Sequence, residues 1–432
     1  MKVHLKSLGC RLNEAELEQW SQQYIAQGYS ISGSAEDADL LVLNTCAVTN
    51  EASRKSRNLI NRLQRNNPRA KLVVTGCHSS LNAQQTADTK GVDLVIPNQQ
   101  KPALATISLD KLHLSTKPRT PAPDDIALYS RGRHRAFIKI QDGCRYRCSF
   151  CIVTVARGDE RSRSVEEIVE DIRRFDEQGI NEAVLTGVHV GGFGSDNESS
   201  LFELVEKILA DTDIQRLRFA SVEPWDLPDH FFSLFNDKRV MPHMHLPLQS
   251  GSDTVLRRMS RRCKTQEFSA LVDKARSHVD GFNVTSDIIV GFPGETEQEW
   301  QQTMKFVEST GFGHLHIFPY SPRTGTKAAR LDDQIDTQTK RRRIKELTEL
   351  ANAMKKTSLQ KAINTTQAVL WEKPSKQADG QIIYHGYTPN FHRVKTVVSG
   401  NNSLEHQVTD TNITAIDSTD LALTGITTDR DD

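Results

Sequence analysis

The first 118 residues alternate short apolar runs with longer segments whose apolar positions recur at helical spacing. The apolar runs predict strands at residues 3–8, 40–44, 72–75 and 94–96. The segments between them predict helices at residues 13–27 and 51–65, the second ending before Pro68, which cannot continue a helix. Strands that alternate with helices form parallel βαβ units, so we expect an N-terminal parallel α/β domain.

The same alternation returns between residues 136 and 321. Strands are predicted at residues 136–140, 182–186, 216–220, 243–248, 284–290 and 314–318, and helices near residues 164–178, 200–210, 264–278 and 296–309. This many β/α repeats predict a partial β/α barrel, whose active site gathers at the carboxyl ends of the strands.

The last third changes character. Residues 336–362 predict one long helix, and short strands follow at residues 368–371, 382–387, 392–398, 406–416 and 422–425. Such closely spaced strands favour a small antiparallel β-barrel. Residues 115–128 contain three prolines and predict a stiff linker. We therefore expect an α/β multidomain chain with domains at residues 1–118, 129–363 and 364–428.

Composition is that of an ordinary globular protein, with 37% hydrophobic and 25% charged residues and a formal net charge of zero. No apolar run is long enough for a membrane span, and the first residues lack a signal-peptide core, so we expect a cytoplasmic protein without a membrane partner. Charge is uneven, however: residues 131–163 hold nine basic and three acidic side chains, and residues 336–362 eight and three. The end is acidic. Basic density favours a polyanionic partner, although solvated helix and loop faces would look the same.

Three of the seven cysteines, Cys144, Cys148 and Cys151, are spaced C-x3-C-x2-C, with Phe150 before the third. Three thiolates from one loop can hold three irons of a 4Fe-4S cube and leave one iron with an open coordination position. A structural zinc knuckle would need a fourth Cys or His at short spacing, and the nearest downstream histidine is His189.

Three further cysteines, Cys10, Cys46 and Cys77, each follow a predicted strand. The carboxyl ends of parallel strands meet at one edge of a sheet, so we expect these thiols to lie together and to hold a second cluster. Gly9 and Gly76 would let the backbone approach an inorganic ligand. One such cysteine alone is typical of a small buried hydrophobe. The seventh, Cys263, has no cysteine neighbours, and we interpret it as a spare thiol.

The loop at residues 143–151 closely resembles the signature of the radical S-adenosylmethionine (SAM) enzymes. With the segments SLGCRLN at residues 7–13, NTCAV at 44–48 and TGC at 75–77, the chain resembles the methylthiotransferases, a radical SAM subfamily with an auxiliary cluster in its N-terminal domain. The resemblance implies SAM and two 4Fe-4S clusters as cofactors, with all six cysteines as metal-binding and catalytic residues. It implies that one SAM methylates sulfur on the auxiliary cluster. A second SAM, split by an electron from a donor such as flavodoxin or ferredoxin, yields the radical that activates the target C–H bond.

The resemblance also implies contacts to SAM at the strand ends. Backbone at Thr186 and Gly187 would meet the amino and carboxylate groups, and Ser221 and Glu223 offer further polar atoms. Donors for ribose or carboxylate would come from Gln249 and Ser250, and a surface for adenine from Asp287 and Ile289, with Phe150 beside the cluster. Taken singly, a glycine-rich strand end is more often a tight turn.

Candidate tRNA contacts lie in two segments. Arg157, Arg161 and Arg163 can fork onto phosphates, or can hold their own loop together through salt bridges. Residues 386–395 mix aromatic and basic side chains, a combination that stacks on unpaired bases. This segment resembles the TRAM module, an RNA-binding barrel that ends methylthiotransferases, and implies a tRNA contact at Arg393.

Within the family, the LGCRLN start and the CIVTVARG run at residues 151–158 look most like the enzymes that act on N6-threonylcarbamoyladenosine beside the anticodon. The implied partner is the tRNA anticodon stem-loop. Two alternatives stay open, isopentenyladenosine in tRNA and an aspartate of a ribosomal protein. A hypothesis of a different class is a non-catalytic iron–sulfur protein that binds RNA.

Overall fold

The computed structural model describes residues 1–114, 135–376, 382–398 and 403–427. The predicted linker at residues 115–128 lies outside the described residues. The N-terminal domain is a parallel sheet in the order β2-β1-β3-β4-β5. Its strands are β1 (Lys2–Ser7), β2 (Ser30–Ile31), β3 (Leu40–Thr45), β4 (Lys71–Gly76) and β5 (Leu94–Ile96). Its helices are α1 (Arg11–Ala26), α2 (Asn50–Asn66), α3 (Cys77–Leu81), α4 (Ala83–Ala87) and α5 (Leu104–Lys111), with a 3-10 turn, η1 (Asn98–Ala103).

The apolar run in β3 is continuous because helices cover both faces of the sheet. Leu40 and Val42 pack with α1 and α5, whereas Leu41 and Leu43 pack with α2. All six residues of β3 are buried, as expected for a central parallel strand. The parallel α/β prediction is confirmed, although the edge strand β2 and the helices α3, α4 and α5 were not predicted.

The central domain is a six-stranded partial barrel, as predicted. One half has the order β10-β9-β6 and the other β11-β12-β13, and parallel bridges between Leu217 and Val240 and between Ser221 and His245 join them. The strands are β6 (Arg135–Lys139), β9 (Glu182–Thr186), β10 (Arg216–Phe219), β11 (His243–His245), β12 (Asn283–Val290) and β13 (His314–Pro319). The outer helices are α8 (Val165–Glu177), α9 (Leu201–Asp211), α10 (Asp253–Arg258), α11 (Thr265–His278), α12 (Glu297–Thr310) and α13 (Thr337–Gln360).

The C-terminal domain is a closed five-stranded barrel in the order β14-β18-β19-β17-β16, closed by pairing of β16 with β14. Its strands are β14 (Thr366–Trp371), β15 (Ser375–Lys376), β16 (Ile382–Tyr387), β17 (Arg393–Val398), β18 (Val408–Asp417) and β19 (Ala422–Thr427), with β15 added beside β16. The predicted small barrel is confirmed, but not all of its pairs are antiparallel. β17 and β19 pair in parallel because β18 intervenes between them in the chain.

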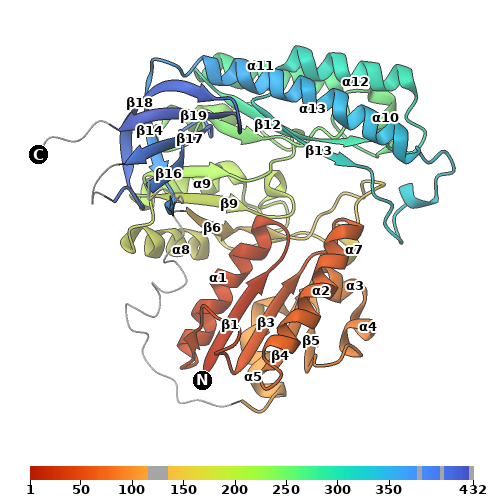
Figure 1. Cartoon of the computed structure of the whole chain (residues 1–432), viewed down its shortest axis with the longest axis vertical. Helices are drawn as coiled ribbons and strands as arrows, with labels where there is room; N and C mark the ends of the chain where they lie inside the picture. Colours follow the sequence, from red (N-terminus) through yellow and green to blue (C-terminus); the bar gives the residue numbers. More distant parts are fainter. Residues whose placement is uncertain (115–134, 377–381, 399–402, 428–432) are drawn as a thin grey trace, which may run out of the picture.

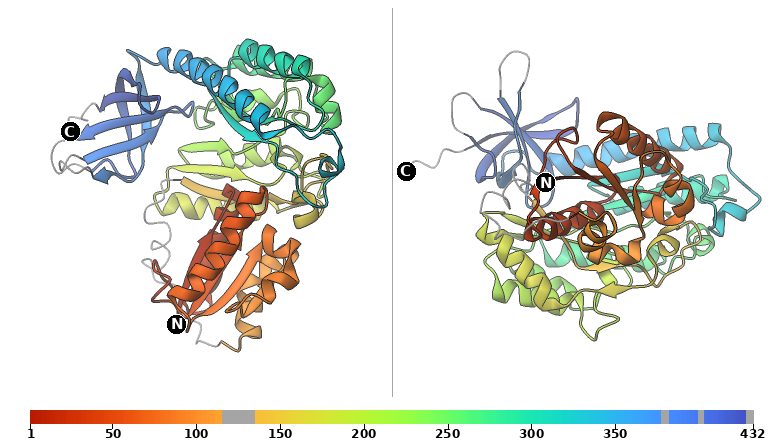
Figure 2. Two further views of the ribbon diagram at one scale, coloured as in Figure 1. Left: turned by 45° about the vertical axis from the view of Figure 1, so that its right-hand side comes forward. Right: turned by 90° about the horizontal axis from the view of Figure 1, so that it is seen from below.

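The three domains pack against one another (Figure 1). The N-terminal sheet lies below the partial barrel, and α1 packs against β6. The C-terminal barrel sits to one side of the central domain, next to the C-terminal end of α13 (Figure 2). Among the described residues, no helix has the length and apolar character that crossing a membrane requires.

Candidate active site

All six cysteines of the two triads line one cavity of about 440 Å³. Cys10, Cys46 and Cys77 follow β1, β3 and β4, so the common sheet edge predicted for them is where the cavity lies. Burial is the main reason that the pKa of Cys46 rises to about 11, and the neighbouring charges of Cys10 and Cys77 add to it. Three thiols gathered in one largely buried place are a donor set suited to a metal cluster.

Glycine is required before Cys10 and Cys77 for a steric reason. Gly9 has φ +105°, and a Cβ on it would stand 2.6 Å from Cys46 Sγ. Gly76 has φ +104°, and a Cβ there would meet the Thr45 backbone at 2.3 Å. The two glycines make room for protein atoms that hold the triad.

The second triad is presented by a tightly braced loop after β6. Its ends are joined where β7 (Gln141–Asp142) pairs with β8 (Arg161–Ser162), and Cys144 N donates to Gly158 O at 3.1 Å. Within the loop, Cys151 N donates to Cys148 O at 3.0 Å. Burial raises the pKa of Cys144 to about 12 and that of Cys151 to about 11. This triad, too, is suited to a metal that supplies the missing positive charge.

Most residues predicted to contact SAM line the same cavity. These are Phe150, Gly187, Ser221, Glu223, Gln249, Asp287 and Ile289. Phe150 also packs in a small apolar cluster with Met259, Phe292 and Tyr320, which anchors the loop. Thr186 is buried and lines an adjoining second cavity instead.

Ser250 does not line either cavity. Its side chain is fully buried, its hydroxyl lies 3.2 Å from Thr303 Oγ1, and it accepts from Ser252 N. The predicted contact between Ser250 and a cofactor is therefore wrong. Ser250 instead holds the turn that presents Gln249, because its neighbours consume its hydrogen bonds.

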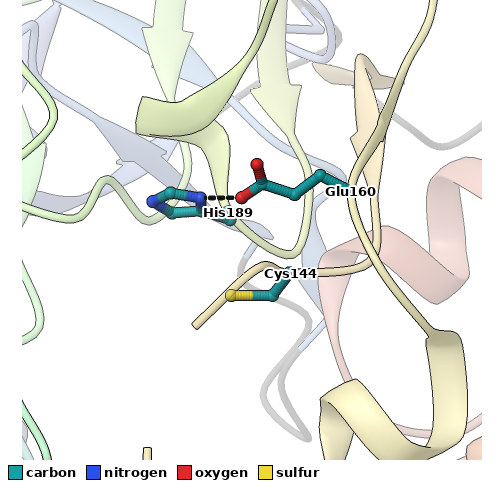
Figure 3. Close-up of side chains that lie close together, drawn as sticks. All are labelled: Cys144, Glu160 and His189. Carbon is teal, nitrogen blue, oxygen red and sulfur yellow. Dashed lines mark hydrogen bonds and ion pairs between the residues drawn. The ribbon is translucent and has the colours of Figure 1, made fainter. Parts of the chain in front are cut away.

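A buried charge cluster supports the loop from behind. His189 is fully buried, its Nδ1 contacts Glu160, and its Nε2 lies 2.6 Å from Asp226 Oδ2. Figure 3 shows His189 and Glu160 pointing toward one another near Cys144. One sulfur, carboxylate-oxygen or ring-nitrogen atom from each of these three residues lies within 4.8 Å of the other two. Although burial disfavours the imidazolium, hydrogen bonds with Asp226 and Glu160 raise the pKa of His189 to about 9. These ion pairs hold the His189 ring and the Glu160 carboxylate in place beside Cys144.

Among the cavity-lining residues that the sequence prediction did not include are Arg261 and Trp225. Arg261 Nη1 lies 3.7 Å from Cys148 Sγ, and its guanidinium lies 4.4 Å from the centre of the Trp225 ring. The basic RRCK run at residues 261–264 was a signal, but attention there fell on Cys263. That thiol is buried in the barrel core and donates to Lys264 O.

Arg157 was predicted to bind tRNA, and the structure corrects this. Its side chain is 1% exposed, and its guanidinium donates to Glu16 Oε1, Asp142 Oδ1 and Asn13 Oδ1 at 2.7 to 2.9 Å. A guanidinium so buried and so occupied does not reach a surface phosphate. The alternative role, holding the structure together, is the one that Arg157 has.

The carboxylate of Glu16 lies at the centre of this buried network between the two domains. It accepts from Lys101 at 2.5 Å, from Lys139 at 3.0 Å and from Arg157. Lys139 also pairs with Asp142 at 2.7 Å, so three cations share two carboxylates. Because Glu16 belongs to α1 and Lys139 to β6, the network couples the placement of one cysteine triad to that of the other.

The other predicted tRNA contacts lie nearer the surface. Arg163 pairs with Asp171 at 2.8 Å and donates to Lys139 O, so it too acts partly as a brace. Arg161 is exposed. Arg393, on β17, is exposed and lies 3.8 Å from Asp420.

Comparison with known proteins matches two families. Residues 138–307 match the radical SAM superfamily, and residues 2–97 match the uncharacterized protein family UPF0004. The division agrees with the boundary between the N-terminal sheet and the partial barrel.

Relatives of known name match across nearly the whole chain. The threonylcarbamoyladenosine tRNA methylthiotransferase MtaB of Bacillus subtilis is 35% identical over 91% of this chain and 89% of its own. MtaB of Aquifex aeolicus is 34% identical over 81% of this chain and 88% of its own. The tRNA-2-methylthio-N(6)-dimethylallyladenosine synthase of Methylacidiphilum infernorum is also 34% identical, over 87% and 85%.

Among solved structures, the radical SAM methyltransferase TsrM from Kitasatospora setae, with cobalamin and a [4Fe-4S] cluster bound, is similar with a TM-score of 0.58. The identity is 14%, over 76% of this chain and 77% of that one, so the likeness concerns the fold alone.

Proposed function

The chain belongs to the radical SAM tRNA methylthiotransferases of the MtaB type, and on that premise we propose that it attaches a methylthio group to C2 of N6-threonylcarbamoyladenosine beside the anticodon of tRNA. The observation that carries the proposal is that two cysteine triads, more than 60 residues apart in sequence, open into one cavity. A reaction that joins sulfur from one metal centre to a carbon activated at another needs such a shared space.

Membership of the radical SAM superfamily implies SAM and one 4Fe-4S cluster, and Cys144, Cys148 and Cys151 fit that cluster. We propose a second cluster at Cys10, Cys46 and Cys77, because those three free thiols line the same cavity as the first triad. When bound, these groups supply the electron that splits SAM and the sulfur that is transferred.

The protein's own side chains bind and orient the cofactor and exclude water from the site. The guanidinium of Arg261 beside Cys148 suits the carboxylate of SAM, and Trp225 holds that guanidinium in place. The apolar walls contributed by Phe150 and Ile289 keep water from a reactive intermediate. Buried Arg157, which also lines the cavity, keeps the two triads in register through Glu16.

We propose that the anticodon stem-loop contacts Arg161 and Arg393, both exposed. Arg393→Glu should weaken tRNA binding several-fold, since it replaces an attraction to phosphate by a repulsion. Lys207→Glu, an equal charge change on the outer helix α9, is the matched control. Equal affinities for the two variants would argue against this contact. A tRNA substrate is also the basis for proposing a cytoplasmic location, and a flavodoxin or ferredoxin stays our prediction for the electron donor.

The deciding experiment is nucleoside mass spectrometry on total tRNA from cells with and without the gene. Loss of 2-methylthio-N6-threonylcarbamoyladenosine alone supports both reaction and substrate. Loss of the 2-methylthio isopentenyl analogue instead would support methylthiolation but would make isopentenyladenosine the substrate. No change in any tRNA nucleoside would contradict the proposal and direct attention to a ribosomal-protein substrate.

The non-catalytic alternative has a separate test. An iron-replete sample given SAM and dithionite without oxygen should form 5′-deoxyadenosine if the protein is an enzyme. A protein that only binds RNA would form none.

A further inference from the structure

A second cavity, of about 560 Å³, adjoins the first inside the partial barrel. Cys10, Leu12, Gly187 and Ser221 line both cavities, so the two lie side by side. Among the described residues, the lining includes no aspartate or glutamate, but it includes five basic side chains and five histidines. These are Arg11, Arg135, Arg218, Lys355 and Arg393, and His243, His245, His314, His316 and His392. A lining of this composition is suited to a ligand with negative charge.

Arg218 is the most deeply placed of these cations. Its side chain is 2% exposed, and its Nε and Nη2 donate to the two oxygens of Glu182 at 3.1 Å each. Its Nη1, by contrast, has no hydrogen-bond partner in the structure. Phe391 holds the guanidinium from one side, with the ring centre at 4.7 Å. A buried guanidinium N–H without a partner is costly, which favours a ligand group that accepts from it.

The charge around Arg218 is not balanced by protein groups. Arg216 also pairs with Glu182 at 3.1 Å, and Arg135 pairs with Glu372 at 2.7 Å, so three buried or nearly buried arginines face two carboxylates. One positive charge is left over. A single anionic ligand group at this place would neutralise it.

Burial disfavours the charged form of at least three of these histidines, His243, His314 and His392. Burial lowers the pKa of His243 well below its ordinary value, and burial lowers those of His314 and His392 to about 4. His243 Nε2 lies 3.0 Å from Thr285 Oγ1, while its Nδ1 has no partner. A carboxylate does contact this group: Asp287, which lines the first cavity, lies 3.2 Å from His245 Nε2. A neutral His243 beside Arg218 can therefore complete a site for one carboxylate.

We propose that this second cavity binds the carboxylate of the threonyl group on the substrate adenosine, with Arg218 Nη1 and His243 as its recognition groups. The inference rests on the proposed function and adds the residues that choose the substrate. With the N6 substituent in the second cavity, the base would lie toward the first, where the cysteine triads are. A neutral isopentenyl group would leave the N–H of Arg218 buried and unpaired, which is how the site would reject it.

The test measures binding of synthetic anticodon stem-loops to the cluster-reconstituted, SAM-bound protein without oxygen. Four RNAs are compared, carrying threonylcarbamoyladenosine, its methyl ester, isopentenyladenosine or unmodified adenosine. The methyl ester differs from the natural group in two ways: it lacks the negative charge and carries one extra methyl group. Wild-type protein should bind the natural group roughly ten-fold or more tightly than the ester, as expected for one hydrogen-bonded charge. Equal affinities would overturn the inference without any variant.

Arg218→Gln should abolish the preference for the free carboxylate over the ester. Arg216→Gln is the matched control, because Arg216 is also buried and bound to Glu182 but does not line the cavity, so it should keep the preference. Circular dichroism establishes that both variants are folded. If Arg218→Gln instead weakened binding of all four RNAs equally, Arg218 would contact the phosphate backbone, and the inference would be wrong.

Failure of this inference and failure of the proposed function give different results. A wild-type enzyme that methylthiolates the natural group and the ester equally well would leave the proposed function standing and overturn the carboxylate site. A wild-type enzyme that methylthiolates only the isopentenyl RNA would overturn both.

Discussion

Gly9→Ala should remove the auxiliary cluster while leaving the radical SAM cluster in place. The new methyl group would lie 2.6 Å from Cys46 Sγ and 2.7 Å from Cys46 Cβ. Because non-bonded heavy atoms rest at about 3.5–4.0 Å, Cys46 would have to move by about 1 Å. Metal–ligand distances tolerate only about ±0.2 Å, so a shift of that size exceeds what a cluster ligand can absorb.

Cys46 cannot easily retreat, which is why we expect loss of the ligand and not relaxation. Its N–H donates to Ser56 Oγ at 3.1 Å, and its carbonyl accepts from the same hydroxyl at 3.0 Å. The alanine also costs about 1–3 kcal/mol of backbone strain, because φ at this position is +105°. Gly179→Ala is the matched control, since Gly179 has φ +78° but a Cβ there meets nothing within 4 Å.

The assay is iron and sulfide content after anaerobic reconstitution, together with two activities. We expect Gly9→Ala to hold about four irons per chain in place of about eight, to cleave SAM and to form no methylthiolated product. Gly179→Ala should keep both clusters and lose only some stability. A Gly9→Ala protein with full iron content and normal methylthiolation would refute the reasoning from the Cys46 contact.

Three further outcomes are expected. Cys148→Ala should abolish formation of 5′-deoxyadenosine, whereas Cys46→Ala should spare SAM cleavage and abolish methylthiolation, and equal loss of cleavage in both would contradict two separate roles. Glu16→Gln should lower the free energy of unfolding by about 3–5 kcal/mol, because it leaves buried cations without their carboxylate. Glu14→Gln, in a salt bridge nearer the surface, should lower it by under about 1 kcal/mol. Similar denaturation midpoints for the two variants would count against the network. Burial works against the carboxylate of Glu182, but its three arginine neighbours lower its pKa to about 2, so its contribution to stability is complete above pH 4.5 and is lost as pH falls from there toward 2. Between pH 4.5 and 2, the stability of the wild type should therefore fall more steeply with pH than that of Glu182→Gln. Parallel curves of stability against pH would contradict this role of Glu182.

The elements could be read from the sequence because each apolar run matches one burial environment. β9 begins and ends where predicted, and the long helix differs by one or two residues at its ends. The strand predicted at residues 243–248 is regular only over His243–His245, although the chain keeps bonding to β12 as far as Gln249, which bridges to Ile288. β2 was missed because two residues cannot show an alternating pattern.

The arginines show where such reasoning stops. Nothing near Arg157 in the sequence indicates that Glu16, 141 residues earlier, will pair with it. A charged residue in a basic loop has the same local pattern whether it faces solvent or a buried carboxylate. Ser250 is a similar case, because its partner Thr303 comes from a helix 53 residues away.

The cysteine chemistry could be predicted from the sequence alone. The spacing of Cys144, Cys148 and Cys151 is local, and the position of a cysteine after each of three strands follows from the apolar pattern. Local spacing and strand topology place donors at a common edge without any knowledge of side-chain packing. The surroundings of that edge, by contrast, depend on tertiary contacts. The single cavity shared by both triads, the buried charges that couple them, and the unpaired N–H of Arg218 all depend on contacts between segments far apart in the chain, and such contacts leave no periodic signal in the sequence.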